Sequence, residues 1–288
     1  MNYRHSYHAG NFADVLKHVV VIELLLSLCK KPTPLCYLDT HAGAGFYDLF
    51  SAAASKNKEY VNGIEKIMQA AHAPLIIKSY LECVRNIHHR LLGATFSSLR
   101  YYPGSPLIAQ HFTRCNDRLI ACELHPQEYQ LLKNTIAHDH STEKSIAIHH
   151  MDGYLGLKAF LPPRERRGLI LIDPPYEHPN EFTHIMRAVV TALKRWETGV
   201  YAIWYPLKDK REVERFYRSM RQTIPSKHLI FVIELSIYPD VAMQLNGCGM
   251  MIVNPPFQFE QAVQSFLPWL WTTLSVQKQG QFRAYFLK

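Results

Sequence analysis

The stretch that decides the fold is Leu35-Cys36-Tyr37-Leu38-Asp39-Thr40-His41-Ala42-Gly43-Ala44-Gly45. A short apolar run leads into a turn with two glycines, which predicts a buried strand followed by backbone that can approach a ligand closely. Strand and turn in this order usually begin a nucleotide-binding α/β domain. A dinucleotide fingerprint would need glycine or alanine at position 48, which is aspartate, and no Gly-Lys-Ser or Gly-Lys-Thr sequence supplies a phosphate loop. Taken alone, the turn could also merely join a strand to a helix.

Helices and strands alternate on both sides of this stretch. Before it, residues 11–29 repeat apolar side chains at helical spacing behind Asn11, a suitable helix cap. After it, residues 51–99 are mainly helical in pattern and predict a helical insertion. Further apolar runs, separated by helix-like segments, occupy 119–122, 146–149, 169–172, 199–204, 229–235 and 250–253. We therefore expect one α/β domain over residues 1–288, built on a doubly wound parallel sheet.

The composition is that of a folded protein with a basic surface. Of the 288 residues, 48% are hydrophobic and 19% charged, and the formal net charge of +8 favours a polyanionic partner without identifying it. The cysteines include no Cys-x-x-Cys pair, and His5 and His8 have no carboxylate cluster at ligand spacing, so we expect no disulfide framework and no metal site. The apolar segment 19–28 contains Glu23 and is too short to span a membrane, and we expect a cytoplasmic protein.

Two acidic residues follow the next two strands. Glu123 ends the run 119–122, where it could accept hydrogen bonds from both hydroxyls of a ribose. Asp152, followed by Gly153, is placed to accept a hydrogen bond from an adenine amino group. Each acid alone is more commonly a loop residue or a helix cap. Their order after the glycine turn, which contains Gly43, favours a ligand with a nucleoside part.

The most specific motif is Asp173-Pro174-Pro175-Tyr176 at the end of the apolar run 169–172. The N6 amine of adenine is a poor nucleophile because its lone pair is delocalised into the ring, so a catalyst must orient it and accept its protons. Asp173 and the Pro174 carbonyl can each accept a hydrogen bond from this amine, and the prolines hold both acceptors rigidly. Tyr176 can stack on a base that is extruded from a nucleic acid. The motif predicts methylation of an adenine amine.

A second segment, Asn254-Pro255-Pro256-Phe257, has nearly the same form. Asp173 ends the strand after the Asp152 strand, as the first strand beyond a topological switch should, whereas Asn254 lies among the last strands. We interpret the second segment as a structural turn.

The N-terminal segment is dense in polar and aromatic side chains. Arg4 and Lys17 could contact phosphates, and Tyr3 or Tyr7 could stack on a base. A terminus that is merely packed or disordered would explain the same residues. Two further basic groups, at 164–167 and 208–211, could border a substrate groove or simply be solvated surface.

These motifs together resemble a family, the bacterial 23S rRNA adenine-N6 methyltransferases of the large subunit methyltransferase J type. The resemblance runs almost end to end and is carried by 3–18, 38–45, 103–106, Glu123, 151–153, 173–176 and 254–257. It implies a Rossmann-like class I methyltransferase sheet of seven strands with an inserted helical subdomain. It also implies a monomer that uses S-adenosylmethionine and acts on 23S rRNA, the family target being adenine 2030. It implies that Tyr3 touches the RNA, that Asp173 accepts a proton, and that the cofactor is surrounded by His18, His41, Ser105, Glu123, Asp152, Gly153 and Asp173.

Three alternatives stay open from the sequence. A DNA adenine-N6 methyltransferase would share the Asp173 to Tyr176 motif, because the motif does not show which sugar is bound. A noncatalytic RNA-binding module could keep the fold, although the intact motif argues against it. A nicotinamide oxidoreductase fits the glycine turn less well than either.

Overall fold

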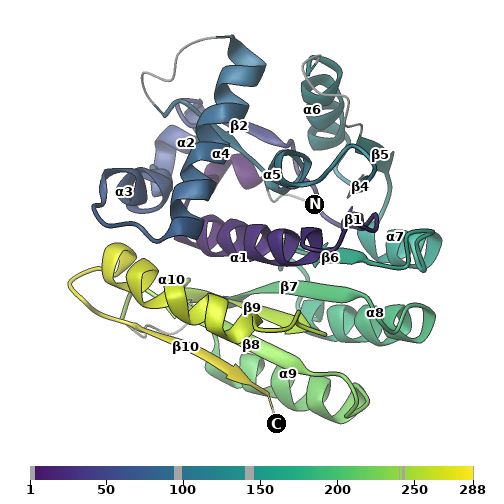
Figure 1. The fold of residues 1–288 in the computed structure, drawn as a ribbon. Coiled ribbons are helices and arrows are strands. Elements are labelled where there is room, and N and C mark those ends of the chain that lie inside the picture. The colour runs from purple at the N-terminus through teal and green to yellow at the C-terminus, as the bar shows by residue number, and fades with distance from the viewer. Residues whose placement is uncertain (1–3, 94–98, 140–145, 240, 242–243, 288) are drawn as a thin grey trace.

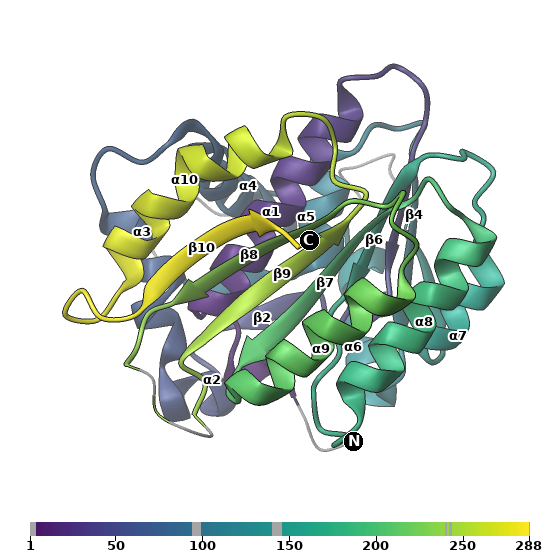
Figure 2. The same ribbon diagram turned by 90° about the horizontal axis from the view of Figure 1, so that it is seen from below.

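A computed structural model describes residues 4–93, 99–139, 146–239, 241 and 244–287. Its main feature is an eight-stranded sheet with the strand order β10-β8-β9-β7-β6-β1-β4-β5 (Figures 1 and 2). The strands are β1 (Cys36–Asp39), β4 (Arg118–Glu123), β5 (Ile146–His150), β6 (Gly168–Ile172), β7 (Val200–Leu207), β8 (Ile230–Ser236), β9 (Gly247–Val253) and β10 (Gln281–Phe286).

The direction of the strands follows the Rossmann-like pattern that the sequence predicts. Strands β5, β4, β1, β6 and β7 are parallel, and the chain order reverses at β1, which pairs with both β4 and β6. Strand β9 instead runs antiparallel to β7 and β8, so the sheet is not purely parallel. Strand β10 is antiparallel to β8 at the edge and brings the sheet to eight strands rather than seven. Its first residues, Gln281 to Arg283, alternate polar and apolar side chains, so its apolar run is short.

Helices cover both faces of this sheet. One face carries α1 (Phe12–Cys29), α5 (Ser105–Phe112) and α10 (Phe259–Leu274), and the other carries α7 (Gly153–Phe160), α8 (Glu181–Arg195) and α9 (Lys210–Thr223). Helix α6 (Pro126–Ala137) lies beside β4 and β5 (Figure 1).

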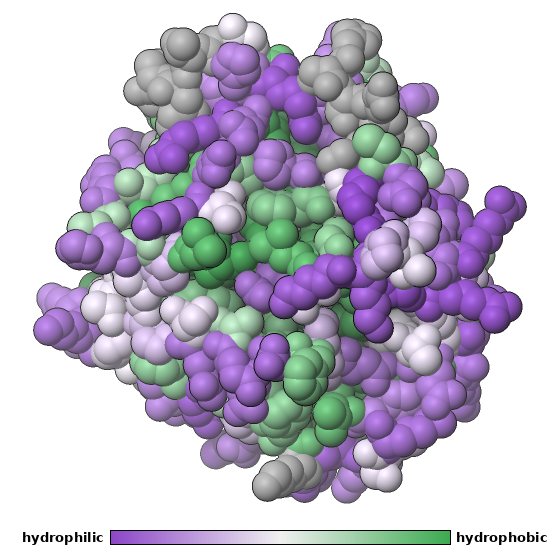
Figure 3. All heavy atoms as spheres, viewed as in Figure 1, coloured by the Kyte–Doolittle hydropathy of each residue, from purple (hydrophilic) through white to green (hydrophobic). Residues whose placement is uncertain are grey.

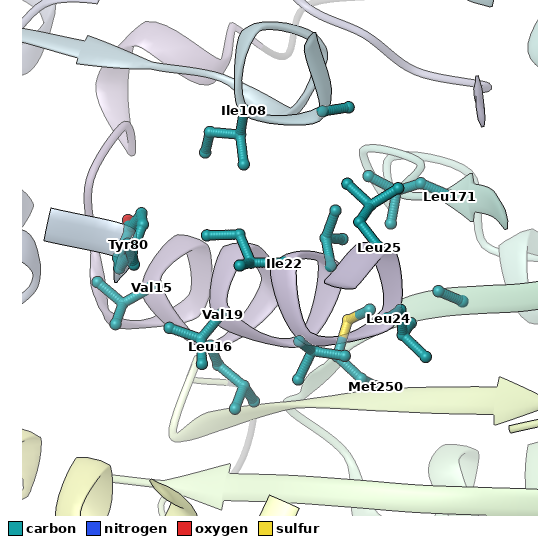
Figure 4. Packing of buried hydrophobic residues seen from close by; sticks show 14 of the residues in the cluster. Val15, Leu16, Val19, Ile22, Leu24, Leu25, Tyr80, Ile108, Leu171 and Met250 are labelled. Atoms are coloured by element: carbon teal, nitrogen blue, oxygen red, sulfur yellow. The ribbon is translucent and has the colours of Figure 1, made fainter. Parts of the chain in front are cut away.

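Helix α1 is buried over most of its length, as its apolar pattern predicts. Asn11 caps it by accepting hydrogen bonds from the backbone of Ala13 and Asp14. In Figure 4, Ile108 of α5 and Tyr80 approach the helix on one side, and Met250 of β9 approaches it on the other. Because the first half of α1 is packed on all sides, its polar residues Asp14, Lys17 and His18 lie in the interior.

The stretch between β1 and α5 contains the glycine turn and four helical segments. An antiparallel pair, β2 (Phe46–Asp48) and β3 (Tyr101–Pro103), encloses α2 (Ala52–Asn57), η2 (Glu59–Asn62), α3 (Ile64–Gln69) and α4 (Leu75–Leu92). Buried residues of α3 and α4 belong to the same hydrophobic cluster as α1. The helices of this stretch therefore share their core with the sheet.

Three further observations concern possible membrane helices, the cysteines and the molecular surface. No helix among the described residues is both long and apolar enough to cross a membrane. All six cysteines are free thiols. In Figure 3, apolar side chains gather near the centre of one face, in the region of α1 and α5, and hydrophilic side chains surround them.

Candidate active site

A cavity opens at the carboxyl ends of β1, β4 and β6, where parallel strands deliver their terminal side chains to one edge of the sheet. It brings together most of the residues that the sequence singles out. Those that line it are Lys17, His18, His41, Gly43, Ser105, Glu123, Asp173, Pro174 and Tyr176. The N-terminal segment closes one side through His5 and His8. Tyr3 lies outside the described residues.

The glycine turn is held by the acid of the next strand. The Gly43 N–H donates to Glu123 Oε2 at 2.7 Å, and the His125 N–H donates to Glu123 Oε1 at 2.7 Å. Gly43 has a φ of +62°, and a Cβ there would lie 2.2 Å from the Tyr47 hydroxyl, so no side chain fits. Burial raises the pKa of Glu123, although the two N–H groups act against this shift.

Asp39, which the sequence prediction did not include, organises the floor of the site. Its Oδ2 accepts hydrogen bonds from the Ser105 hydroxyl at 2.6 Å and the Tyr37 hydroxyl at 2.9 Å. Burial raises the pKa of Asp39 to about 6, and the nearby charge of Asp173 acts in the same direction. Ser105 is thus committed to Asp39. The position of Asp39 at the end of β1 matches that of Glu123 at the end of β4, and this parallel could have identified it.

Lys17 lies inside an ion-pair chain rather than on the surface. Its Nζ is 2.6 Å from Asp173 Oδ2 and 2.8 Å from Asp14 Oδ1. Asp14 also accepts from His5 Nε2 at 2.8 Å and from the Gly10 N–H at 2.9 Å. Lys17 is only 5% exposed. The arrangement does not support the expected phosphate contact, because both partners of the ammonium are protein carboxylates.

Burial disfavours the charged forms of Lys17 and Asp14, but the attraction to their oppositely charged neighbours outweighs this effect. Burial by itself would lower the pKa of Lys17, but Asp14 and Asp173 raise it well above its ordinary value. Burial would likewise raise the pKa of Asp14, but His5 and Lys17 lower it well below its ordinary value. Lys17 is therefore a permanent positive partner for the Asp173 carboxylate.

The segment after Asp173 is fixed by an aromatic anchor. Tyr176 has a φ of +52°, and its hydroxyl donates to the Trp204 carbonyl at 2.7 Å. The Tyr176 ring packs edge-on against Trp204 and Phe182. The competing Asn254 follows antiparallel β9, beside the first residues of β7, and so lies at the opposite edge of the sheet. Its amide donates to the carbonyls of Glu197 and Gly199, as a structural turn requires.

Asp152 and Gly153 do not line the cavity but hold α7 against the glycine turn. Asp152 caps α7 by accepting from the Tyr154 N–H at 2.7 Å. A Cβ on Gly153 would lie 2.0 Å from the Thr40 carbonyl oxygen. Burial lowers the pKa of His41 to about 4, against the opposing charges of Asp173 and Asp152. Asp152 therefore acts electrostatically on His41 in the cavity wall.

Arg4 lies on the surface near the cavity. It is exposed, and its guanidinium donates to Gln127 Oε1 of α6 at 2.7 Å. Lys208 is also exposed and lies on the cavity lining. These two cations, unlike Lys17, present charge to solvent.

Comparison with known proteins identifies the family. A family model described as Ribosomal RNA large subunit methyltransferase D, RlmJ, matches residues 32–287. The chain belongs to this family. Two RlmJ relatives named Ribosomal RNA large subunit methyltransferase J are 41% identical in Escherichia coli K12 and 38% identical in Haemophilus influenzae Rd. The first match covers 95% of this chain and 94% of the relative, and the second covers 98% and 97%.

A solved structure has the same fold. The crystal structure of a protein from Legionella pneumophila is 38% identical, has a TM-score of 0.84 and covers 97% of each chain. The resemblance to the RlmJ family and the Rossmann-like fold predicted from the sequence are therefore confirmed.

The cavity fits the methyl donor that the RlmJ resemblance implies, S-adenosylmethionine. His18 is 1% exposed, and its Nε2 lacks a hydrogen-bond partner among the described residues. At Gly43 only backbone is present, where a side chain would obstruct the methyl donor. Among the described residues, no group of three or more His, Cys, Asp or Glu side chains could hold a metal ion.

Proposed function

We propose that this protein transfers a methyl group from S-adenosylmethionine to the N6 amine of an adenine in 23S rRNA, the family target being adenine 2030. The proposal rests on the position of Asp173-Pro174-Pro175-Tyr176. This segment lines the same cavity as the glycine turn and Glu123. The names of the RlmJ relatives support the rRNA part of the proposal.

The methyl donor would be held by the cavity wall. Glu123 would accept hydrogen bonds from the ribose hydroxyls, and the Gly43 turn would lie against the donor. Asp152, which lies outside the cavity lining, would accept from the adenine amine where the donor extends beyond the cavity. Three further side chains would complete its surroundings, namely His18, His41 and Ser105. When bound, S-adenosylmethionine supplies an electrophilic methyl group.

The protein's own contribution to the reaction is to orient the target amine and to accept its proton. Lys17 occupies Asp173 Oδ2, whereas Oδ1 accepts no hydrogen bond among the described residues. Oδ1 and the Pro174 carbonyl would therefore receive the two N–H groups of the adenine. As N6 gains positive charge these hydrogen bonds strengthen, which stabilises the transition state more than the ground state. Tyr176, anchored on Trp204, would stack on the extruded base.

The RNA would approach over the N-terminal side of the cavity. Arg4 is exposed near this side, and Lys208 adds an exposed cation at the cavity. The family resemblance implies that Tyr3 also touches the RNA. The net charge of +8 favours such a polyanion. We further propose that the protein acts as a monomer in the cytoplasm.

The proposal is tested by transfer of labelled methyl groups to unmodified 23S rRNA, followed by nuclease digestion and mass spectrometry of the nucleosides. We expect N6-methyladenosine at one site. Asp173→Asn is expected to lower turnover by about a thousandfold or more, because it removes the proton acceptor but keeps the shape. The control Glu260→Gln removes a carboxylate in the first turn of α10, which follows the Asn254 turn at the opposite edge of the sheet, and should transfer normally.

Other outcomes would identify the alternatives. Label in DNA but not in RNA would make the protein a DNA adenine methyltransferase. RNA binding without any transfer would favour a noncatalytic module. Normal transfer by Asp173→Asn would contradict the role given to Asp173.

A further inference from the structure

His18 presents an unusual combination for a buried histidine. It lies on α1 and lines the cavity. One ring nitrogen, Nε2, is buried without a partner, and the other, Nδ1, lies 2.7 Å from the Tyr102 hydroxyl. A buried polar atom without a partner is destabilising unless a ligand supplies one. Nε2 is therefore the atom that His18 offers to the cavity.

Nδ1 is the end of a short hydrogen-bonded chain. The Tyr102 hydroxyl of β3 is 2.6 Å from the Tyr80 hydroxyl of α4. Both tyrosines are fully buried, and the two hydroxyls make no other hydrogen bond among the described residues. The His18 ring also stacks on Tyr102, with centroids 5.5 Å apart. Figure 4 shows Tyr80 beside α1.

Either direction of hydrogen bonding leaves one hydrogen of this chain unpaired, but only one direction leaves it on the cavity side, where a ligand can accept it. If Tyr80 donates to Tyr102, then Tyr102 donates to Nδ1, and the single hydrogen of the neutral imidazole resides on Nε2. In the reverse direction His18 donates to Tyr102 and Tyr102 to Tyr80, which leaves the Tyr80 hydrogen buried without an acceptor. Leaving such a group unpaired costs about 1–3 kcal/mol.

The charge of the cavity indicates what an Nε2–H donor would serve. The lining carries Asp14, Glu123, Glu128 and Asp173, and its buried cation Lys17 is already shared by two of them. The Ser105 hydroxyl is committed to Asp39. A ligand carboxylate entering this acidic surrounding needs a donor that no protein group has taken. Burial lowers the pKa of His18 to about 3, so the ring is neutral at physiological pH.

We propose that Tyr102, backed by Tyr80, positions His18 as the Nε2–H tautomer, so that His18 donates a hydrogen bond to the carboxylate of the methyl donor. The choice of ligand rests on the proposed function, whereas the tautomer rests on the hydrogen-bonded chain and on the position of His18 in the cavity lining. Tyr102 is a positioning residue, because it acts on the ligand only through His18. Strand β3, which carries Tyr102, thereby influences the donor site.

The tautomer can be measured directly in the full-length protein without any ligand. Long-range ¹H–¹⁵N NMR spectra of protein labelled with ¹⁵N-histidine distinguish the two neutral tautomers, and His18→Gln assigns the signals. We expect the Nε2–H form in the unaltered protein. Tyr102→Phe removes the donor to Nδ1 and should give a mixed or reversed tautomer. Tyr80→Phe is the matched control, because Tyr102 must still place its hydrogen on Nδ1, and the tautomer should stay.

Binding of S-adenosylhomocysteine, measured by calorimetry, tests the ligand. Tyr102→Phe should weaken it about tenfold or more, whereas Tyr80→Phe should change it less than about twofold. Both variants lose one buried hydroxyl from the same cluster, so a loss of folding stability common to both would not mimic this difference.

Three results have distinct meanings. An Nδ1–H tautomer in the unaltered protein, or an unchanged tautomer in Tyr102→Phe, would overturn the positioning role. A changed tautomer with unchanged affinity would overturn the carboxylate assignment. If the unaltered protein shows the Nε2–H tautomer but binds no S-adenosylhomocysteine, the proposed function fails while the tautomer assignment is supported.

Discussion

At the scale of single residues, the site depends on buried charges that need one another. Asp14, Lys17 and Asp173 form one chain in which the cation lies between the two carboxylates. Removing Lys17 takes the cation from both carboxylates and leaves Asp14 only His5, which is far more destabilising than removing a matched pair. The catalytic position is therefore tied to the stability of α1.

Replacing Lys17 with methionine tests this dependence. Lys17→Met leaves Asp14 and Asp173 facing each other, and we expect a loss of about 3 kcal/mol in unfolding free energy and a large loss of methyl transfer. The double variant Asp14→Asn, Lys17→Met removes one of the stranded charges. It should recover part of the stability in urea titrations but not the transfer. A double variant no more stable than the single one would contradict the chain.

The neutral, buried His18 predicts a pH effect on stability. Its pKa is lowered to about 3 in the folded protein, while the unfolded chain binds the proton near pH 6.5. Between these values the unfolded state holds more protons, so the contribution of His18 to stability falls as the pH drops from about 6.5 towards 3.

A comparison of the unaltered protein with the His18→Gln variant isolates this effect. From about pH 7 to pH 5, His18 should account for a loss of about 2 kcal/mol, which His18→Gln should not show. The difference is needed because Asp39, with its pKa raised to about 6, contributes with the opposite sign. Parallel pH curves for the two proteins in urea titrations would rule out a neutral, buried His18.

At the scale of secondary-structure elements, close backbone contacts position the loops of the site. Gly153 begins α7 directly against Thr40 of the glycine turn. Gly63, before α3, lies against Gly10 of the N-terminal segment, and the Ile64 N–H donates to the Gly10 carbonyl at 2.8 Å. Elements far apart in sequence thus meet without side chains between them.

Gly153→Ala should push α7 away from the turn. A Cβ would lie 2.0 Å from the Thr40 carbonyl oxygen, and neither backbone can move alone. We expect a loss of about 3 kcal/mol in thermal or urea unfolding and weaker binding of S-adenosylhomocysteine. Gly93→Ala is the control for backbone strain alone, since Gly93 has a positive φ, which Gly153 does not, and open space around it. It should lose only about 1 kcal/mol. Equal effects in both variants would count against the close contact.

At the scale of elements, sequence prediction also had a definite limit. The parallel strands from β1 to β7 were predicted because each is an apolar run between helices. The antiparallel direction of β9 was not predicted, since the pattern of an apolar run does not indicate in which direction the strand runs. Edge strand β10 escaped prediction because its first three residues are exposed and include two polar side chains, which leaves only a short apolar run.

At the scale of the whole molecule, charge is distributed unevenly. Acidic groups line the cavity, whereas the protein as a whole has a net charge of +8. Cations such as Arg4 and Lys208 remain exposed near the opening. This distribution suits a polyanion that covers the surface and a small donor that enters the interior.

Salt should therefore affect the two substrates differently. Raising monovalent salt from about 50 to 200 mM should increase the KM for rRNA about tenfold or more if two or three phosphates are contacted. The affinity for S-adenosylhomocysteine, measured under the same conditions, should change less than about twofold, because its contacts are buried. A KM for rRNA that is insensitive to salt would argue against phosphate contacts as the main source of RNA affinity.

The sequence by itself determined the alternation of strands and helices, the glycine turn and the motif that begins at Asp173. These features are local, because apolar spacing, glycine and proline restrict the backbone within a few residues. The sequence also favoured Asp173 over Asn254 from strand order alone, and the structure places Asn254 at the opposite edge of the sheet.

Only the tertiary structure decided what surrounds each functional side chain. Lys17 looked like a surface cation, yet the burial of α1 turns it inward to Asp173, 156 positions away. The partners of His18 and the role of Asp39 likewise depend on residues brought together by the sheet and the helical stretch. The physical reason is that hydrogen bonds and ion pairs act over a few ångströms of space, and spacing along a chain does not encode that distance.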